Sequence, residues 1–281
     1  MSADSQAVYR GMRIGTASPS VEELSELPHH LVGIADPACE QFGAGRFVSM
    51  ADEACADIFS RGKFPLVVGG TGFYVRNFLL GLPPTPVSDP VLRKRLNARA
   101  AEEGSRALHE ELSAVDRKSA EKINPNDAYR ICRALEVFYS SGKPLSSYRQ
   151  DTRLREGYSF CTVILSRGRD ELYRRIDERV EMMFRLGLQE EVEALRRDGC
   201  VMGSPGMRAI GYREFFDPSL KSQEEIKAAV KLHSRQYAKK QYTFMRGIPG
   251  AVTVSADDIS GAERVISDFC SRSGHLLTPG C

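Results

Sequence analysis

The segment Phe64–Gly72 constrains the fold of this chain most. It reads FPLVVGGTG, a short run of apolar residues that ends in a glycine-rich turn. A strand that is apolar on both faces is typical of a parallel sheet covered by helices. The next stretch, from Phe73 to Leu80, predicts a helix. The order of strand, turn and helix predicts an α/β fold.

A helical stretch interrupts this pattern. Prolines at 83, 84 and 86 break the chain, and Asp89-Pro90 then predicts the start of a helix. No strand signal returns before about residue 159. We therefore predict an α/β core formed by residues 1–87 and 151–281, with a helical insertion at 88–150. A chain of 281 residues is long enough for a main domain and a smaller one.

Periodicity and capping residues predict the remaining elements. The first is a helix that begins at Asn126-Asp127, buries Ile131, Leu135 and Phe138 on one face and ends at Gly142. A strand at 159–165 and a helix with Leu172, Ile176, Val180 and Met183 in one stripe follow. The last elements are helices at about 205–216 and 223–246, a strand near 251–254 and a helix at about 259–270.

Composition excludes several classes. A net charge of +2 does not by itself indicate a nucleic-acid partner, although it allows locally basic faces. No apolar run approaches the roughly 20 residues that span a bilayer, and no signal peptide is visible. The seven cysteines include no Cys-x-x-Cys pair, which favours reduced thiols over a disulfide framework or a zinc site. His29-His30 is more simply a pair of loop residues than a metal site. We expect a cytoplasmic protein with no membrane segment.

A polar cluster lies at residues 2–17, which read SADSQAVYRGMRIGTA. An accessible Asp4 is ionised at neutral pH because the reference pKa of Asp is near 4. Its carboxylate could accept a proton from a reacting amine within hydrogen-bond reach. The simpler interpretation is that Asp4 caps a turn, as Asp-Ser pairs often do. Taken alone, the run favours the turn.

Four motifs, in order, resemble bacterial tRNA dimethylallyltransferases over nearly all of the chain. They are the Asp4 run with its Tyr9-Arg10-Gly11 and Ile14–Ala17, the segment Gly69–Leu82, the segment Pro125–Val137 and the segment Met207–Glu214. The resemblance implies a P-loop NTPase-like parallel-sheet core with a helical insertion that grips the tRNA anticodon stem-loop. It implies transfer of a dimethylallyl group from dimethylallyl diphosphate to N6 of adenosine 37, with Mg²⁺ as cofactor, by a monomeric enzyme.

The resemblance also implies a role for individual residues. Asp4 would be the base that engages the exocyclic amine, Thr71 would contact tRNA near the reacting base, and Arg208 would help to hold the diphosphate. No metal ligand is identifiable. Gln6-Ala7-Val8 departs from the family's usual order, in which Gln stands directly before Val. The positions implied to contact tRNA are Asp4, Ser5, Gln6, Ala7, Thr71, Arg93, Tyr129, Arg130, Ile131, Cys132 and Arg133.

The segment from Lys227 to Arg246 contains six Lys or Arg residues and no Asp or Glu. Four of them recur every four residues, with aromatic residues between them. A charge run on a helix is usually a solvated face. A stripe of one sign with aromatic residues nevertheless suits RNA phosphates and stacked bases, so we expect RNA contact here.

The family's phosphate-binding loop, G-x-x-x-x-G-K-[ST], occurs nowhere in the chain, and neither does the strand that precedes it. We expect a gene start upstream of Met1, rather than a fragment or a degenerate gene. Two other functions stay open beside the tRNA transferase. One is a catalytically impaired tRNA-binding fragment or homologue. The other is an adenylate isopentenyltransferase acting on a free nucleotide, against which Arg93, Arg130 and Arg133 of the insertion argue.

Overall fold

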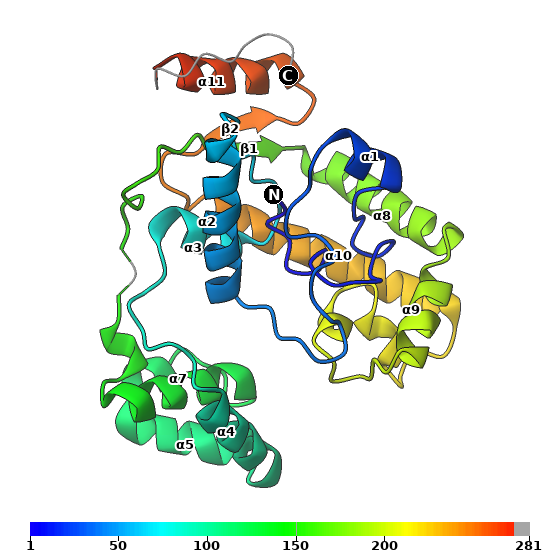
Figure 1. The fold of residues 1–281 in the computed structure, drawn as a ribbon. Coiled ribbons are helices and arrows are strands. Elements are labelled where there is room, and N and C mark those ends of the chain that lie inside the picture. The colour runs from blue at the N-terminus through cyan, green and yellow to red at the C-terminus, as the bar shows by residue number, and fades with distance from the viewer. Residues whose placement is uncertain (150, 273–281) are drawn as a thin grey trace. The chain divides into compact units, whose positions relative to one another are not determined.

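The computed structural model describes residues 1–149 and 151–272. The chain forms two compact units (Figure 1). The core unit contains Met1–Leu79 and the chain from Leu154 onward, and the insertion unit contains Leu80–Arg153. The residues predicted as a helical insertion, 88–150, fall within the second of these units.

A two-stranded parallel sheet lies in the core unit. Strand β1, Val163–Ser166, pairs with β2, Val252–Ser255, so that the first residues of the strands are partners and so are the last. The strand predicted at 159–165 therefore begins four residues later than expected. The connection between the strands contains α8 (Arg169–Arg185), α9 (Leu188–Arg197) and α10 (Gln223–Met245), and α11 (Ile259–Arg272) follows β2. The helices predicted at the places of α8, α10 and α11 are confirmed, whereas α9 was not predicted.

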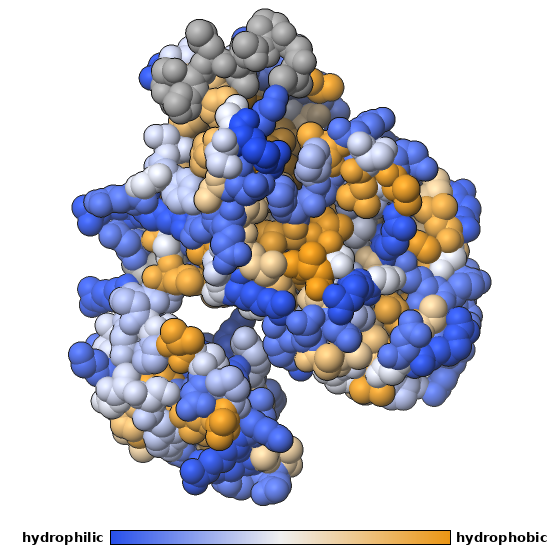
Figure 2. Space-filling model, viewed as in Figure 1, coloured by the Kyte–Doolittle hydropathy of each residue, from blue (hydrophilic) through white to orange (hydrophobic). Residues whose placement is uncertain are grey.

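The prediction of a buried strand at Phe64–Val68 is wrong. Val68 forms a single parallel bridge with Ser2, and the hydrogen bonds of Leu66 and Val68 reach Met1 and Ala3 on one side. Leu66 is 63% and Val68 61% exposed. A buried strand needs neighbours along several residues and cover on both faces, and the described residues supply one neighbour and leave this face open. Figure 2 shows apolar patches of this kind interrupting a mainly hydrophilic surface.

Aromatic packing joins two helices of the core unit. Helix α2, Ala44–Ser60, and α3, Gly72–Leu80, follow the short α1, Val21–Glu26. Phe47 of α2 stacks on Tyr74 of α3 with 4.4 Å between the ring centroids, and Phe78 meets Phe47 edge to face. Such contacts contribute beyond the area that they bury. They hold α3, and therefore the turn in front of it, against the body of the unit.

The helix predicted at about 205–216 is also wrong. Two 3₁₀ turns, η2 (Gly206–Arg208) and η3 (Arg213–Phe216), replace it. Gly211 between them has φ of +94°, in the left-handed region through which a right-handed helix cannot continue. The break allows both Met207 and Tyr212 to be buried in the core.

The described residues of the insertion unit form helices and the loops that connect them. It contains α4 (Pro90–Glu102), α5 (Ser105–Val115), α6 (Arg117–Ala120), α7 (Ala128–Ser141) and η1 (Leu145–Ser147). Asp89 caps α4 and Asp127 caps α7, each by accepting backbone N–H groups, and Gly142 ends α7 with φ of +68°. Ile131 and Leu135 are fully buried, whereas Phe138 is half-buried. No described helix of either unit combines the length and the apolar character that a bilayer crossing requires.

Candidate functional site

Asp4 lies in a turn that follows the extended residues Met1–Ala3. Its Oδ1 accepts hydrogen bonds from the backbone N–H groups of Gln6, at 2.7 Å, and Ala7, at 3.2 Å. This is the turn cap that the simpler interpretation expects. No described residue donates a hydrogen bond to Oδ2, and the residue is half-buried. One carboxylate oxygen is therefore occupied by the turn, and the other is available to a ligand.

Thr71 is brought to this turn although it is far away in the sequence. Its Oγ1 accepts from the Ser5 N–H at 2.9 Å and donates to Ser5 Oγ at 3.2 Å. Its own N–H donates to the Ala3 carbonyl at 3.2 Å. A Cβ on Gly69 would lie 2.4 Å from the Ala3 carbonyl carbon, so the close approach of the two segments requires glycine there. The structure thus places Asp4, Ser5 and Thr71 in one cluster, the Asp4 cluster.

Gln6 adds an unsatisfied acceptor to the Asp4 cluster. Its Nε2 donates to Ser5 Oγ at 3.3 Å, but its Oε1 is buried without a hydrogen-bond partner. Leaving such an atom unpaired costs about 1–3 kcal/mol. A ligand N–H would remove this cost. Ala7 is buried, so it takes part through its backbone.

Two residues beside Asp4 were missed in the sequence. Desolvation lowers the pKa of Arg179, on α8, and the Asp4 carboxylate opposes this shift, so the two charges lie within electrostatic range of each other. Burial raises the pKa of Tyr237, on α10, the Thr71 hydroxyl opposes this shift and Asp4 adds to it. Arg179 had one available signal: the positions three and four residues away carry no carboxylate, unlike those around Arg174.

Arg208 lies apart from these contacts. It is exposed at the end of η2, and its Nη2 lies 3.5 Å from the Gly203 carbonyl oxygen. Burial raises the pKa of Tyr9, and the Arg208 charge is among the groups that oppose that rise. No hydrogen bond or ion pair joins Arg208 to Asp4 or Thr71 among the described residues.

Arg93 and Arg133 are both engaged inside the insertion unit. They form ion pairs with Glu136 Oε2 at 2.7 and 3.0 Å, and the Glu136 side chain is completely buried. Ser88 and the N–H of Asp89 donate to the other carboxylate oxygen. Burial raises the pKa of Glu136, but the hydrogen bonds from Ser88, Arg133 and Arg93 outweigh burial and hold the pKa below its ordinary value. These two arginines therefore neutralise a buried carboxylate.

The segment Tyr129–Arg133 is only partly at the surface. Tyr129 is 57% exposed, with the Arg93 guanidinium 4.6 Å from its ring centroid. The Arg130 side chain is 71% exposed and pairs with Asp127 at 2.6 Å. Ile131 and Cys132 are fully buried in the unit's core, so their side chains cannot reach a partner. A contact from this segment comes from its exposed members.

The RNA-contacting stripe expected on α10 is largely neutralised. Lys231 and Lys227 pair with Glu181 of α8 at 2.5 and 3.2 Å, and Arg235 pairs with Asp177 at 3.2 Å. Glu181 and Asp177 belong to a neighbouring helix, so periodicity within α10 could not reveal them, whereas Glu224 of α10 itself also pairs with Lys227, at 3.0 Å. RNA contact by this part of α10 stays a prediction. The cations that stay exposed, with no ion pair to a described residue, are Lys239, Lys240 and Arg246.

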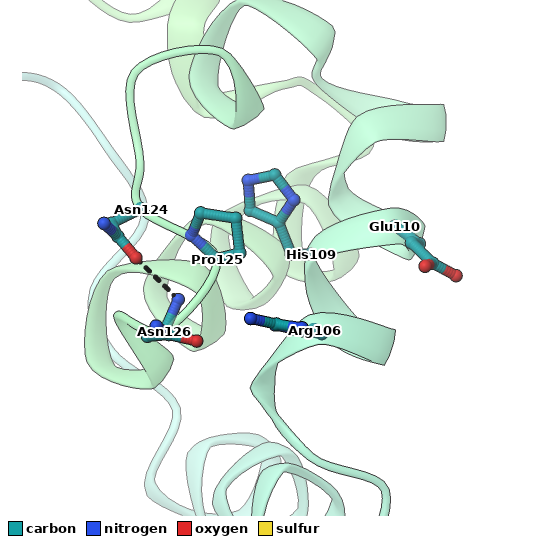
Figure 3. A pocket seen from close by; sticks show the side chains of 6 residues that line it. All are labelled: Arg106, His109, Glu110, Asn124, Pro125 and Asn126. Atoms are coloured by element: carbon teal, nitrogen blue, oxygen red, sulfur yellow. Dashed lines mark hydrogen bonds between the residues drawn. The ribbon is translucent and has the colours of Figure 1, made fainter.

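One further pocket of about 310 Å³ lies on the insertion unit. Figure 3 shows Arg106 and His109 reaching from α5 toward Asn126 and Pro125, with Glu110 pointing away. The His109 Nε2 lies 3.0 Å from two backbone carbonyl oxygens, so this nitrogen carries the proton that they share. The pocket contains none of the predicted site residues.

A metal site is not formed by the residues that the structure describes. No group of three or more His, Cys, Asp or Glu side chains among them is arranged to hold a metal ion. The Nδ1 of His29 lies 2.7 Å from the Leu27 carbonyl oxygen, which suits a loop residue. The described residues therefore include no cluster of such side chains that could bind Mg²⁺ by itself.

Fold and cluster together define a class of protein: an α/β protein with a helical insertion and a half-buried carboxylate that has one open oxygen. The chain belongs to the IPP transferase family, whose model matches residues 7–248.

Relatives agree with this assignment. A tRNA dimethylallyltransferase from Geobacter sulfurreducens is 43% identical over 252 residues, which is 89% of this chain and 81% of the relative. The full-length tRNA isopentenylpyrophosphate transferase from Bacillus halodurans has a similar structure, with a TM-score of 0.66 and 34% identity over 97% of this chain and 86% of that one. A eukaryotic dimethylallyltransferase acting on tRNA gives a TM-score of 0.78 and 25% identity over 99% and 73%. The predicted family and fold class are confirmed.

Proposed function

We propose that this chain transfers a dimethylallyl group from dimethylallyl diphosphate to tRNA, at N6 of adenosine 37 beside the anticodon. The observation that carries the proposal is the Asp4 cluster. One oxygen of the Asp4 carboxylate is held by two backbone N–H groups, and the other is open beside the Thr71 hydroxyl. A chain of this family with such a carboxylate is suited to act on an amine.

The reaction needs a base and room for the nucleobase. The N6 nitrogen forms a bond to C1 of the dimethylallyl group, the bond from C1 to the diphosphate oxygen breaks, and the diphosphate leaves with the electron pair. Asp4 Oδ2 accepts the amine proton. The adenine must leave its stack, at a cost of a few kcal/mol. The unpaired Gln6 Oε1 then accepts an N–H from the extruded base, which removes the cost of leaving that oxygen buried.

Positive charge must meet the leaving group. Arg208 and Arg179 are the cations of the core unit that we assign to the diphosphate. Mg²⁺ stays part of the proposal because it neutralises phosphate oxygens when bound, but we derive no step through it because the described residues form no site for it. In this proposal the protein acts as a monomer in the cytoplasm, and exposed Tyr129 and Arg130 contact the anticodon stem-loop.

The test is transfer of label. The chain is incubated with labelled dimethylallyl diphosphate, Mg²⁺ and either tRNA or AMP, and we expect label in tRNA. Asp4→Asn is the matched variant, since its amide oxygen still accepts the N–H groups of Gln6 and Ala7 but cannot take a proton. We expect kcat to fall by about 10²–10⁴, the usual contribution of a general base, with an unchanged unfolding temperature.

Each competing function predicts another outcome. Label in AMP indicates an adenylate isopentenyltransferase. Binding of tRNA without transfer indicates an impaired tRNA-binding homologue. Full turnover by Asp4→Asn would show that Asp4 is not the base.

A further inference from the structure

One face of α10 lies against the turn that carries Thr71. Gln241 Nε2 donates a hydrogen bond to the Gly70 carbonyl at 2.9 Å. The Phe244 ring packs on Gly72, and the Tyr237 side chain faces Thr71. Tyr237, Gln241 and Phe244 are spaced at i, i+4 and i+7, so they share one face of the helix. We call these three residues the platform.

Two platform residues pack closely against the glycines of the turn. A Cβ on Gly70 would lie 2.1 Å from Gln241 Nε2, and a Cβ on Gly72 would lie 2.3 Å from Phe244 Cδ1. Both distances are far inside van der Waals contact. On its other side the turn touches Ala3, whose carbonyl carbon would lie 2.4 Å from a Cβ on Gly69. The turn is therefore held between α10 and the segment that leads into Asp4.

This arrangement determines where the Thr71 hydroxyl lies. Ala3 and Ser5 bond the Thr71 N–H and hydroxyl from one side. Those bonds alone would let the turn move together with the N-terminal segment. Gln241 hydrogen-bonds the same turn to the long helix α10. This bond fixes the position of Thr71 relative to the rest of the core unit. The bond between Ser5 and Thr71 fixes the position of Asp4, the residue before Ser5, in the same way.

We propose that the platform is a positioning element for the transfer reaction, because it holds the Gly69–Gly72 turn so that the Thr71 hydroxyl and the Asp4 carboxylate keep one mutual geometry. The inference rests on the proposed function. Its three residues act through Thr71 and are positioning residues. A displacement of about 1 Å in such a group can cost on the order of a hundredfold in rate. One lost hydrogen bond costs only about 1 kcal/mol of stability.

The first test compares two glutamines of the same helix. Gln241→Ala removes the bond to Gly70, whereas Gln236→Ala alters an exposed residue that makes no side-chain hydrogen bond to a described residue. We expect kcat of Gln241→Ala to fall tenfold or more, with KM for tRNA within about twofold and an unfolding temperature within a few degrees of wild type. Gln236→Ala should match wild type. An unchanged kcat for Gln241→Ala would overturn the proposal.

The second test creates the clash and relieves it. Gly70→Ala puts a methyl group where Gln241 Nε2 lies, and Gly70→Ala with Gln241→Ala removes the obstacle. We expect Gly70→Ala to lose more than tenfold in kcat and to raise amide exchange at residues 69–75. The methyl group displaces the flexible end of Gln241, so the double variant should be no slower and no more exchange-prone than either single variant, and the two effects should not be additive. Additive losses would refute the platform.

The two readouts separate this inference from the proposed function. If wild type transfers no label to tRNA, the proposed function fails. Amide exchange still tests whether Gln241 holds the turn, because it needs no substrate. If wild type is active but the losses of Gly70→Ala and Gln241→Ala add in the double variant, the platform alone is refuted.

Discussion

Replacing Glu136 by Gln should lower the free energy of unfolding of the insertion unit. The Glu136 side chain is 0% exposed, and it neutralises Arg93 and Arg133, whose side chains are 16% and 27% exposed. Gln keeps the shape and can still accept from Ser88 and Asp89. Its NH₂ group, however, would face two guanidinium groups that can only donate. The variant therefore leaves two partly buried cations without a carboxylate.

The magnitude follows from this geometry. Removing one member of a buried ion pair costs roughly 3–5 kcal/mol. Both arginine side chains keep some contact with solvent, so we expect the lower end, about 3 kcal/mol at pH 7. For a unit of this size, that corresponds to a drop on the order of 10–20 °C in unfolding temperature.

The effect should depend on pH. The folded-state pKa of Glu136 lies below the ordinary value of 4.5. A carboxylate with a lowered pKa contributes its full stability above the unfolded-state value and loses it as pH falls through the folded-state pKa. The difference between wild type and Glu136→Gln should therefore be largest near neutral pH and shrink below about pH 4.5.

The assay must follow the insertion unit by itself, because two units can unfold separately. Urea titration with amide exchange of the α4 and α7 peptides does this. Glu102→Gln, an exposed change on α4, is the control and should lie within about 0.5 kcal/mol of wild type. A Glu136→Gln effect below 1 kcal/mol at pH 7, or one that does not shrink on acidification, would refute the reasoning.

Three further changes test the surface and the core. Arg130→Ala should weaken tRNA binding and lower its salt dependence by about one phosphate contact, with stability within about 0.5 kcal/mol of wild type, as measured by filter binding at several salt concentrations. Asp52→Ala should lower the free energy of unfolding in urea by about 3 kcal/mol. The substitution removes the carboxylate that pairs with Arg155 at 2.5 Å, and the Arg155 side chain is only 16% exposed. Gly15→Ala should destabilise by roughly 1–3 kcal/mol, since its Cβ would lie 2.4 Å from a ring carbon of the fully buried Tyr212; a thermal midpoint equal to wild type would contradict this.

Elements set by local chemistry could be predicted from the sequence. Asp89 and Asp127 cap helices through their own side chains, and Gly142 ends a helix through its own backbone. These interactions join residues only a few positions apart, so the local sequence is enough to predict them. The long helix α10 was predicted in the same way, from its period and its capping residues.

Features that depend on distant partners could not be predicted. The apolar run at Phe64–Val68 pairs on one side only, which its composition does not reveal. The cations of α10 meet carboxylates of α8, and Glu136 meets two arginines. Each partner is fixed by packing between elements. The same limit explains why Tyr237 was overlooked, since its link to Thr71 spans most of the chain.

The two interpretations of Asp4 do not exclude each other. Capping uses Oδ1, which accepts two N–H groups, and these bonds fix the orientation of the carboxylate. A general base accepts a proton efficiently only when its carboxylate is oriented toward the reacting group. The side chain of an Asp that rotates freely is not oriented in this way. In the proposed reaction, the turn cap therefore orients Oδ2 toward the substrate. The structural role of Asp4 as a turn cap is thus a condition for its proposed role as a base.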